Sequence, residues 1–433
     1  MRPSNRTRFT VSGLLLALAV VAALVGRAPN VPRASGPLPQ SAYVWQMAWG
    51  EGVSESVRTR GPEFSGIVVL AAEVNWRSVH PSIRRVKPDW TALAATPGAV
   101  GLAIRIERFA GPFSTKGDQV DALRRLARSL VREAEANDVV VTELQLDFDC
   151  AEAKLPGYQL WVEAVREEIR PTPVGITALP SWLDQRACPE LFATADSVTL
   201  QVHSLERPVD ESSPVRICNP AAAREAIERA GRLGVPFRVA LPTYGYLLAF
   251  DEQGAFAGAS AEGPQPNWPE THRLRELKTN PTAMAALVDG WTRNRPEALR
   301  GVIWYRLPVA NDRMNWAWST LAAVMSGSRP EPRLIAQARR TDRGLYDLSL
   351  VNHGSGDIAN AWTVNVTWDN ARLQSCDGLS NSTITDSGDR FLTLHSHGLT
   401  RGLTPGKTVP IGWLRLDSDN ELQLKIETQT ALP

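Results

Sequence analysis

The sequence has few of the residues that usually hold metal ions. Its 433 residues include 4 cysteines and 6 histidines, and no two cysteines stand in a Cys-x-x-Cys spacing. A zinc site needs clustered ligands of this kind, so their spacing argues against one. Asp147, Asp149 and His203 are the best alternative set of ligands, but their spacing resembles no known metal motif. We therefore predict neither a metal ion nor a cofactor.

An excess of charge of one sign is also lacking. The 47 Lys+Arg and 46 Asp+Glu residues give a formal net charge of +1, and no run rich in lysine or arginine occurs. Proteins that bind nucleic acid usually carry a basic patch, so we expect no nucleic-acid partner. The 14 tryptophans suggest a different kind of partner, because a flat indole ring can stack on a sugar ring as well as fill a large core.

Long hydrophobic runs are absent from the sequence except near the N-terminus. The apolar run Val11–Val25 follows three arginines (Arg2, Arg6 and Arg8) and precedes Gly26-Arg27-Ala28. This order is typical of a bacterial secretory signal. The alternative is an uncleaved anchor in the inner membrane, although the run is a little short for a span of ~20 residues. We predict a signal peptide or anchor over residues 1–28, and a periplasmic or extracellular protein that meets the membrane only through this segment.

Export would permit disulfide bonds. Cys150, Cys188 and Cys218 each follow a predicted strand, so they can meet at one end of a parallel sheet. We expect a Cys188–Cys218 disulfide, with Cys150–Cys188 as the other candidate. Cys376 lies far along the chain, and we expect it to be a free thiol.

Strand patterns alternate with helical patterns over most of the chain, which predicts βα units and a parallel sheet. Helical spacing of apolar residues is clearest over residues 118–137, 158–169 and 220–233. A set of eight such repeats closes naturally into a (β/α)8 barrel, which we place at residues 41–326 after a Pro-rich linker over 29–40. The predicted strands are Tyr43–Trp49, Gly66–Trp76, Val100–Phe109, Val141–Asp149, Val174–Trp182, Ser197–Ser204, Phe237–Tyr246 and Gly301–Pro308.

Two features follow the seventh and eighth strands. Leu247–Phe250 and Ala255–Ala259 flank a turn sequence and predict a β-hairpin, and a Pro-rich loop comes after it. Such an insertion can form a wall of a binding cleft or a surface loop without a role. Residues 327–332 are a linker by composition. Beyond them, strand patterns without helical spacing predict a β-sandwich over residues 333–433.

The stretch from Val141 to Asp149 carries the strongest indication of function. Gln145, Asp147 and Asp149 alternate with leucine and phenylalanine, so the polar residues share one face of the strand. Two carboxylates on one buried face repel each other unless they bind something or share a proton. A solvated strand is the alternative. We expect Asp147 and Asp149 to face the barrel interior.

Polar and aromatic residues also end the other predicted strands, where barrel enzymes carry their sites. Together they resemble what glycoside hydrolysis requires, one carboxyl to protonate the leaving oxygen and another to act as base, nucleophile or charge stabiliser. Each has a structural alternative: Glu73 and Glu107 can pair with Arg105, Arg108 or Arg306, His203 can be a core histidine, and the tryptophans can be packing. The candidate catalytic residues are Asp147, Asp149, Glu107 and His203, and the candidate sugar-binding residues are Trp45, Gln145, Trp182, Gln201, Tyr244, Trp304 and Arg306.

Leu146-Asp147-Phe148-Asp149 resembles the Asp-x-Asp core of the chitinase-like (family eighteen) glycoside hydrolases, and Gly301–Trp304 resembles their last barrel strand, whose tryptophan floors the sugar site. The chain is also similar to an exported bacterial barrel family of unknown function, through Leu146–Asp149, Ile176–Trp182 and Pro242–Gly245. The resemblance implies a glycan-acting barrel.

One departure separates the chain from the chitinase-like pattern. Those enzymes place an acid glutamate two residues after the last aspartate, and this chain has Ala151 there, with Glu152 one residue further on. Two classes of function therefore stay open. The first is an exported glycoside hydrolase with Asp149 or Glu107 as acid. The second is a barrel without catalytic activity that binds saccharide, or a partner, in the envelope.

Overall fold

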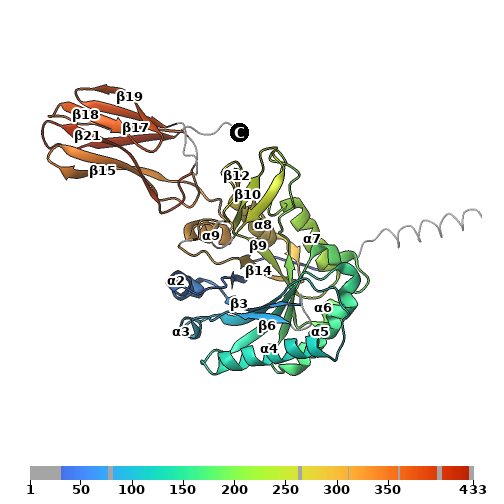
Figure 1. Ribbon diagram of the computed structural model, residues 1–433. Coiled ribbons are helices and arrows are strands. Elements are labelled where there is room, and N and C mark those ends of the chain that lie inside the picture. Colours follow the sequence, from blue (N-terminus) through green and yellow to red (C-terminus); the bar gives the residue numbers. More distant parts are fainter. Residues whose placement is uncertain are drawn as a thin grey trace, which may run out of the picture.

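The structure is a computed structural model that describes residues 31–76, 81–261, 266–310, 312–358, 361–396 and 402–428. The predicted signal or anchor over residues 1–28 lies outside this range. In the described part of the chain, no helix combines the length and the apolar character needed to cross a membrane. Figure 1 shows two bodies, a barrel with helices around it and a β-sandwich beyond it.

The described residues form a closed parallel barrel, as the sequence predicted. Its sheet has the order β2-β14-β9-β8-β7-β6-β5-β3-β4, and β2 also pairs with β3, which closes the barrel and leaves β4 (Ser82–Arg85) as an antiparallel addition. The barrel strands are β2 Gln40–Val44, β3 Gly66–Asn75, β5 Ala99–Ile106, β6 Val141–Phe148, β7 Val174–Ala178, β8 Ser197–Gln201, β9 Phe237–Pro242 and β14 Leu299–Tyr305. All eight predicted strands are present, most of them shorter at the carboxyl end.

Helices pack around the outside of the barrel (Figure 1). The helix α4 (Asp118–Glu135) buries one side, including Leu123, Leu126 and Leu130, and so confirms the spacing seen in the sequence. Asparagine side chains cap α7 and α8, where proline occupies the first helical position. The other helices are α2 Glu51–Arg60, α3 Trp90–Ala94, α5 Leu155–Glu168, α6 Cys188–Thr194, α7 Pro220–Arg232, α8 Pro281–Arg293 and α9 Trp318–Met325.

Two hydrophobic clusters lie on the two sides of the barrel wall. The larger one joins outward-facing strand residues, such as Leu144, Leu146 and Phe148, to the helices. A smaller one, which includes Tyr43, Leu70 and Ile303, fills part of the interior. In β2, β5, β9 and β14 an inner-cluster residue stands between two outer-cluster residues, which is what the pleat of a strand requires. The interior side is the one that reaches the mouth at the carboxyl ends of the strands.

Part of the predicted N-terminal linker packs on the barrel. Arg33–Ala34 form the short strand β1, which pairs antiparallel with β13 (Arg295–Pro296), and Leu38 is buried in the larger cluster. Ordered contacts thus begin before residue 41.

The predicted hairpin after the seventh strand is confirmed and is larger than expected. The strand β10 (Gly245–Phe250) pairs with β11 (Phe256–Ser260) on one side and with β12 (Arg273–Lys278) on the other. The third strand had no clear pattern in the sequence, because its only apolar residues, Leu274 and Leu277, stand three residues apart among charged ones. The sheet also contacts the loop after β8. Arg273 forms an ion pair with Glu211, and the Glu211 backbone N–H donates to the Gly254 backbone oxygen.

The C-terminal strands form two antiparallel sheets around one apolar cluster, as the sequence predicted. Leu348 and Leu414 of one sheet and Val364 and Leu394 of the other are fully buried in this cluster. The sheets have the orders β15-β16-β21-β18 and β19-β20-β17-β22. Their strands are β15 Leu334–Asp342, β16 Leu345–Asn352, β17 Trp362–Thr367, β18 Leu373–Gly378, β19 Ser382–Gly388, β20 Phe391–Ser396, β21 Thr408–Leu416 and β22 Gln423–Thr428.

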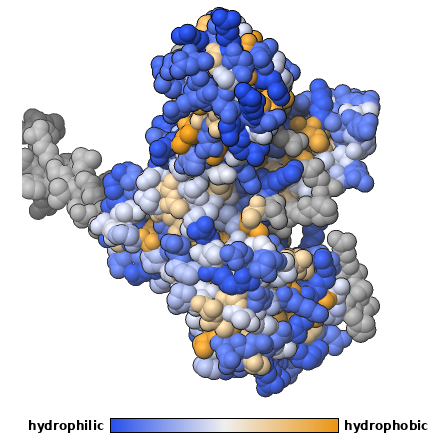
Figure 2. Space-filling view, turned by 90° about the vertical axis from the view of Figure 1, so that its left-hand side faces the viewer, coloured by the Kyte–Doolittle hydropathy of each residue, from blue (hydrophilic) through white to orange (hydrophobic). Residues whose placement is uncertain are grey.

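Polar contacts link the sandwich to the barrel. The hydroxyl of Thr320 on α9 donates to the backbone oxygen of Ser355 at 2.6 Å, and Lys278 at the end of β12 pairs with Asp357 at 2.9 Å. The molecular surface in Figure 2 is mostly hydrophilic, with small, separate hydrophobic patches.

The disulfide expected between Cys188 and Cys218 is not formed, and the other candidate pair is not formed either. All four cysteines are free thiols. Cys188 starts α6 and is fully buried beneath it, and Cys150 and Cys218 are buried in the same outer cluster. Burial raises the pKa of the Cys188 thiol to about 11 and those of Cys150 and Cys218 to about 12. The sequence placed these residues after neighbouring strands correctly, but their side chains serve as small apolar groups in the core.

Candidate functional site

The barrel interior carries an ion pair toward the amino-terminal ends of its strands. Glu143 on β6 pairs with Arg238 on β9 at 2.7 Å and accepts a hydrogen bond from Ser197 at the same distance. Burial by itself raises the pKa of Glu143, but Arg238 and these hydrogen bonds outweigh burial and hold the pKa below its ordinary value. Glycines make room for these side chains: a Cβ atom on Gly101 or Gly175 would lie 3.0 or 3.1 Å from Glu143.

A second polar layer lies above this ion pair. The Tyr43 hydroxyl on β2 donates to Gln145 Oε1 on β6 at 2.7 Å. Both side chains are buried, and burial raises the pKa of Tyr43 well above its ordinary value. Gln145 therefore faces the interior, as the alternation predicted, but it serves the network inside the barrel rather than an open surface.

The third layer, at the carboxyl ends of the strands, holds the two aspartates. Asp147 is buried and accepts from Arg105 Nη1 on β5 at 2.7 Å and from the Thr177 hydroxyl on β7 at 2.6 Å. Asp149 lies just past β6 with its side chain 46% exposed, and it accepts from Arg105 Nη2 at 2.6 Å. Asp147 faces the interior as predicted, whereas Asp149 stands at the rim.

Arg105 changes the interpretation of β6 and its two aspartates, Asp147 and Asp149, which we call the acidic strand. The sequence suggested two carboxylates that repel or share a proton, and the structure places one guanidinium against both. Burial lowers the pKa of Arg105, but Asp147 and Asp149 outweigh burial and hold it above its ordinary value. The cation therefore stays charged, and the opposite charge offsets the repulsion between the two aspartates.

Aromatic rings cover the same end of the interior. Trp45, which follows β2, packs edge-on against Tyr43 with ring centroids 5.2 Å apart, and Tyr305 at the end of β14 lies 5.4 Å from Trp45. Tyr305 also contacts the rings of His203 and Tyr244, both at 5.4 Å. We call Trp45, Tyr305, His203 and Tyr244 the mouth cluster. The sequence singled out three of these four residues.

His203 is the least usual member of the mouth cluster. Its side chain is buried, and its Nδ1 lies 3.4 Å from the Tyr244 hydroxyl. Its Nε2 is buried and has no hydrogen-bond partner. Burial lowers the pKa of His203 to about 3. Gln201 supports the turn after β8 by donating to the His203 backbone oxygen at 3.1 Å.

The other carboxylates named from the sequence are held elsewhere. Glu107 accepts a hydrogen bond from Asn75, and Glu73 pairs with Arg84 at 3.4 Å. Glu152 is exposed and accepts from Gln185 at 2.9 Å. The hydrogen-bond and ion-pair partners of these three glutamates are therefore other residues than those that hold Asp147 and Asp149.

Three of the predicted sugar-binding residues lie away from the mouth. Trp182 is fully buried and donates to the Cys150 backbone oxygen at 3.0 Å, and Trp304 is fully buried and donates to Gln40 at 2.8 Å. Both belong to the outer cluster, because their positions on or after a strand point away from the interior. Arg306 is buried in an ion pair with Asp312 at 2.6 Å and also donates to the Ala261 backbone oxygen.

Arg105, Thr177 and Tyr305 were not chosen as candidate site residues, although Thr177 and Tyr305 were among the polar residues at the ends of the predicted strands. Arg105 and Thr177 share the side of their strands with Ala103 and Gly175, which face the interior, so the alternation could have assigned them. Tyr305 follows Trp304 directly, and the choice between the two depended on which face of β14 lines the interior. A strand that is buried on both faces does not reveal that from its pattern.

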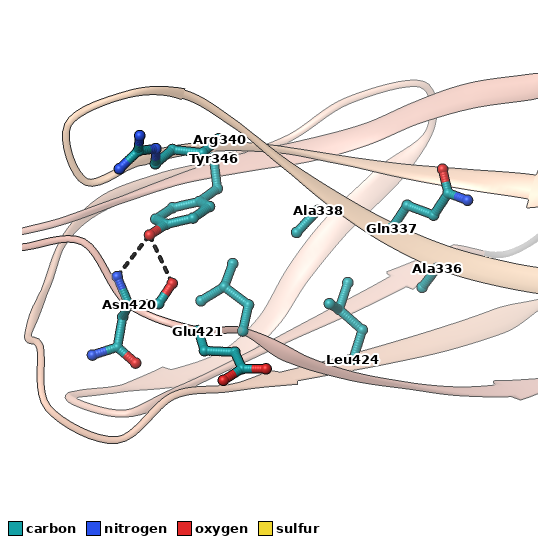
Figure 3. Close-up of a pocket in the computed structure, with 9 residues that line it drawn as sticks. Ala336, Gln337, Ala338, Arg340, Tyr346, Asn420, Glu421 and Leu424 are labelled. Carbon is teal, nitrogen blue, oxygen red and sulfur yellow. Dashed lines mark hydrogen bonds between the residues drawn. The ribbon is translucent and has the colours of Figure 1, made fainter.

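A separate hollow lies on the sandwich, between the edge strands β15 and β22. It has a volume of about 510 Å³, and its floor includes Ala336, Ala338 and Leu424. Figure 3 shows the Tyr346 ring at one end, with its hydroxyl bound by the Asn420 backbone. Glu421 and Arg340 lie at its edge. None of the residues predicted for the site is in this hollow.

No group of three or more histidine, cysteine, aspartate or glutamate residues in the described ranges is arranged to hold a metal ion. The described residues of the barrel mouth contribute hydrogen-bonding groups, aromatic rings and the paired charges of Arg105, Asp147 and Asp149.

Several proteins of known structure are similar to this chain. The spore cortex-lytic enzyme SleL of Bacillus cereus has 12% sequence identity and a TM-score of 0.47, covering 68% of this chain and 75% of its own. A chitinase of Chromobacterium violaceum ATCC 12472 has 14% identity and a TM-score of 0.46, covering 67% and 98%. Chitinase ChiA74 of Bacillus thuringiensis has 10% identity and a TM-score of 0.44, covering 90% and 100%.

No curated protein sequence matches the chain. Residues 103–310, which run from within β5 to just past β14, match a family model described as a domain of unknown function, DUF3142. This segment holds Arg105, the two aspartates of the acidic strand and His203. This part of the barrel is therefore similar to the DUF3142 family model.

Proposed function

We propose that the barrel binds a glycan at its mouth and does not hydrolyse it. The position supports this proposal, since sites of such barrels lie at the carboxyl ends of their strands. The residues support it as well. Tyr305, which is half-buried, supplies an aromatic face next to the polar groups of His203 and Tyr244, and Trp45 is buried against the Tyr305 ring. An aromatic face beside polar groups suits a sugar, which has apolar ring faces and hydroxyl edges.

The observation that carries the choice of binding over hydrolysis is the contact of Arg105 with both aspartates. Glycoside hydrolysis requires a carboxylic acid that delivers a proton to the leaving oxygen. Both oxygens of Asp147 already accept hydrogen bonds, one from Arg105 and one from Thr177. The chitinase-like pattern has its acid two residues after Asp149, and Ala151 occupies that position.

Hydrolysis is the second candidate, and the exposure of Asp149 favours it. This side chain is 46% exposed at the rim, so substrate can reach it, and Arg105 contacts only its Oδ2. In that case Asp149 would be the acid and the Arg105–Asp147 pair would stabilise charge nearby.

A binding and cleavage assay on the full chain separates the two candidates. The probe is chitin hexasaccharide, with binding followed by tryptophan fluorescence and cleavage by new reducing ends. Binding without new reducing ends supports the proposal. New reducing ends that disappear in Asp149→Asn, but not in the control Asp386→Asn on the exposed face of the sandwich, support hydrolysis. Failure of wild type to bind the hexasaccharide or related oligosaccharides would contradict both.

We also propose that the chain is exported to the periplasm or beyond, where envelope and extracellular glycans are found. The basic and apolar pattern of residues 1–28 supports this proposal. A fusion of these residues to a reporter enzyme that is active only after export would test it. Reporter activity that is lost when the apolar run is interrupted by charged residues is the expected result, and an inactive, cytoplasmic fusion would contradict the proposal.

A further inference from the structure

The imidazole of His203 has one nitrogen in use and one without a partner. Its Nδ1 faces the Tyr244 hydroxyl at 3.4 Å, and its Nε2 is buried without any hydrogen bond. A buried polar atom without a partner destabilises the folded state, because it has lost its hydrogen bonds to water. Native proteins satisfy nearly all such atoms, so an exception calls for an explanation, and a functional role is one of them.

The neighbours of His203 indicate what kind of partner fits. The rings of Tyr305 and Tyr244 pack against the imidazole, with centroids 5.4 and 5.7 Å away. Burial alone accounts for the low pKa of His203, and no charged group contributes to it. The ring is therefore neutral at ordinary pH. It presents either an N–H or a lone pair at Nε2, depending on whether the Tyr244 hydroxyl donates to Nδ1 or accepts from it.

The charges at the mouth give a second indication. The guanidinium of Arg105 lies at the mouth, and its charge is already paired with the carboxylates of both Asp147 and Asp149. An anionic ligand would meet two carboxylates and a guanidinium that is already paired. A neutral hydroxyl meets no such penalty, and because it can both donate and accept, it fits either form of the His203 ring.

We infer that His203 hydrogen-bonds an uncharged hydroxyl group of the ligand through Nε2, with Tyr244 holding the other ring nitrogen in place. This inference rests on the proposed function and gives it a binding residue and a ligand class, neutral rather than acidic sugars. Since Nε2 is itself out of contact with solvent, a ligand reaches it only when the covering side chains move. Tyr305, which is half-buried and tilted across His203, is the ring best placed to move.

The test compares the full-length wild type with two variants and a control. His203→Phe keeps a ring of similar shape and removes both nitrogens, while Tyr244→Phe removes only the hydroxyl. His353→Phe is the control, because His353 is exposed on the sandwich. Affinities are measured for chitin hexasaccharide and cellohexaose, which are neutral, and for oligogalacturonate, which is acidic. Melting temperature is recorded for each variant.

The expected result is a combination that a purely structural histidine would not give. His203→Phe should weaken binding of the neutral oligosaccharides about tenfold, the effect of losing about 1.4 kcal/mol. It should leave the melting temperature unchanged or higher, because an unsatisfied buried atom is removed. Tyr244→Phe should weaken binding less and should shift the ¹⁵N resonances of the His203 ring toward a mixture of its two neutral forms. The control should bind as wild type does.

Three other outcomes are informative. Wild-type affinity in both variants would overturn the inference and leave the proposed function standing. Tighter binding of oligogalacturonate than of the neutral sugars would overturn the assignment of the ligand class. If wild type binds none of the oligosaccharides, the proposed function fails and the inference fails with it.

Discussion

Arg105 and Asp147 are joined across two neighbouring strands, with Nη1 of the arginine 2.7 Å from Oδ2 of the aspartate. The strands β5 and β6 pair in register at these two residues. The aspartate is nearly buried, and the same guanidinium also reaches Asp149 at the rim. One cation thus fixes the geometry of the acidic strand, and this is why the strand tolerates two carboxylates on one face.

Replacing Arg105 should lower the stability of the protein, because Asp147 would lose its cationic partner. Arg105→Gln leaves Asp147 buried with only Thr177 as a side-chain partner, so the free energy of unfolding should fall by about 3 kcal/mol. Adding Asp147→Asn to the same chain should restore part of the loss. Urea denaturation measures both. The exposed pair of Arg293 and Asp289 provides the control, since Arg293→Gln should change stability little. Equal effects of Arg105→Gln and Arg293→Gln would contradict the role given to Arg105.

His203 should make the protein sensitive to acid. Its pKa is near 3 in the folded protein and about 6.5 when unfolded, so between these values only the unfolded state takes up the proton. Stability should therefore be constant with respect to this group above pH 6.5, and should fall by about 1.4 kcal/mol per pH unit below it. The titratable groups that face the ring are the phenols of Tyr244 and Tyr305.

The difference between wild type and His203→Phe isolates this effect. Unfolding free energies measured from pH 8 to pH 4 should run parallel above pH 6.5 and diverge below it, with the variant losing less. Parallel curves over the whole range would mean that His203 can be protonated in the folded protein, and would remove the argument for a neutral ring.

Two glycine-to-alanine substitutions should change the stability of the protein in opposite directions. A Cβ atom on Gly175 would lie 2.4 Å from Ser197 Oγ and 3.1 Å from Glu143, inside the closed barrel. Gly175→Ala should therefore destabilise the protein by about 1–3 kcal/mol. Gly290 lies within α8 with nothing near its Cβ position, and Gly290→Ala should stabilise by about 0.5–1 kcal/mol. Thermal unfolding under one buffer condition compares the two variants, and stabilisation by both would contradict the tight packing around Glu143.

The four cysteines should all be free thiols, but a thiol reagent should reach them to different degrees. Cys376 is only half-buried, whereas the other three are buried and have pKa values of about 11 to 12. Because the thiolate is the reactive form, a thiol reagent should modify Cys376 first in the native protein. All four should react in denaturant without a reductant. A count of two under those conditions would restore the disulfide that the sequence suggested.

The sequence was sufficient for the barrel and the sandwich, because each depends on patterns repeated over many residues. The acidic strand was also assigned to the correct face, since Leu144, Leu146 and Phe148 fix its alternation. The strand β12 was missed because its two leucines, Leu274 and Leu277, stand three residues apart and so show no two-residue period. The position of that strand depends on its pairing with β10, which a local pattern does not contain.

The site was harder to predict than the fold. Trp304 and Tyr305 are adjacent, and only the closed barrel shows that the tyrosine lines the interior. Arg105 lay within an apolar run, where a lone arginine requires a counterion, and that requirement could have pointed to Asp147 on the next strand. The unpaired Nε2 of His203 depends on the surroundings of one atom and has no counterpart in a sequence pattern.

The most direct test of glycan binding without hydrolysis follows both events in one sample. The full-length protein is titrated with chitin hexasaccharide in a calorimeter, and the recovered oligosaccharide is then analysed by mass spectrometry. The account predicts saturable binding with the hexasaccharide intact after prolonged incubation, because Arg105 and Thr177 occupy Asp147 and Ala151 offers no acid. Shorter oligosaccharides that accumulate with time, and that Asp149→Asn no longer produces, would contradict it.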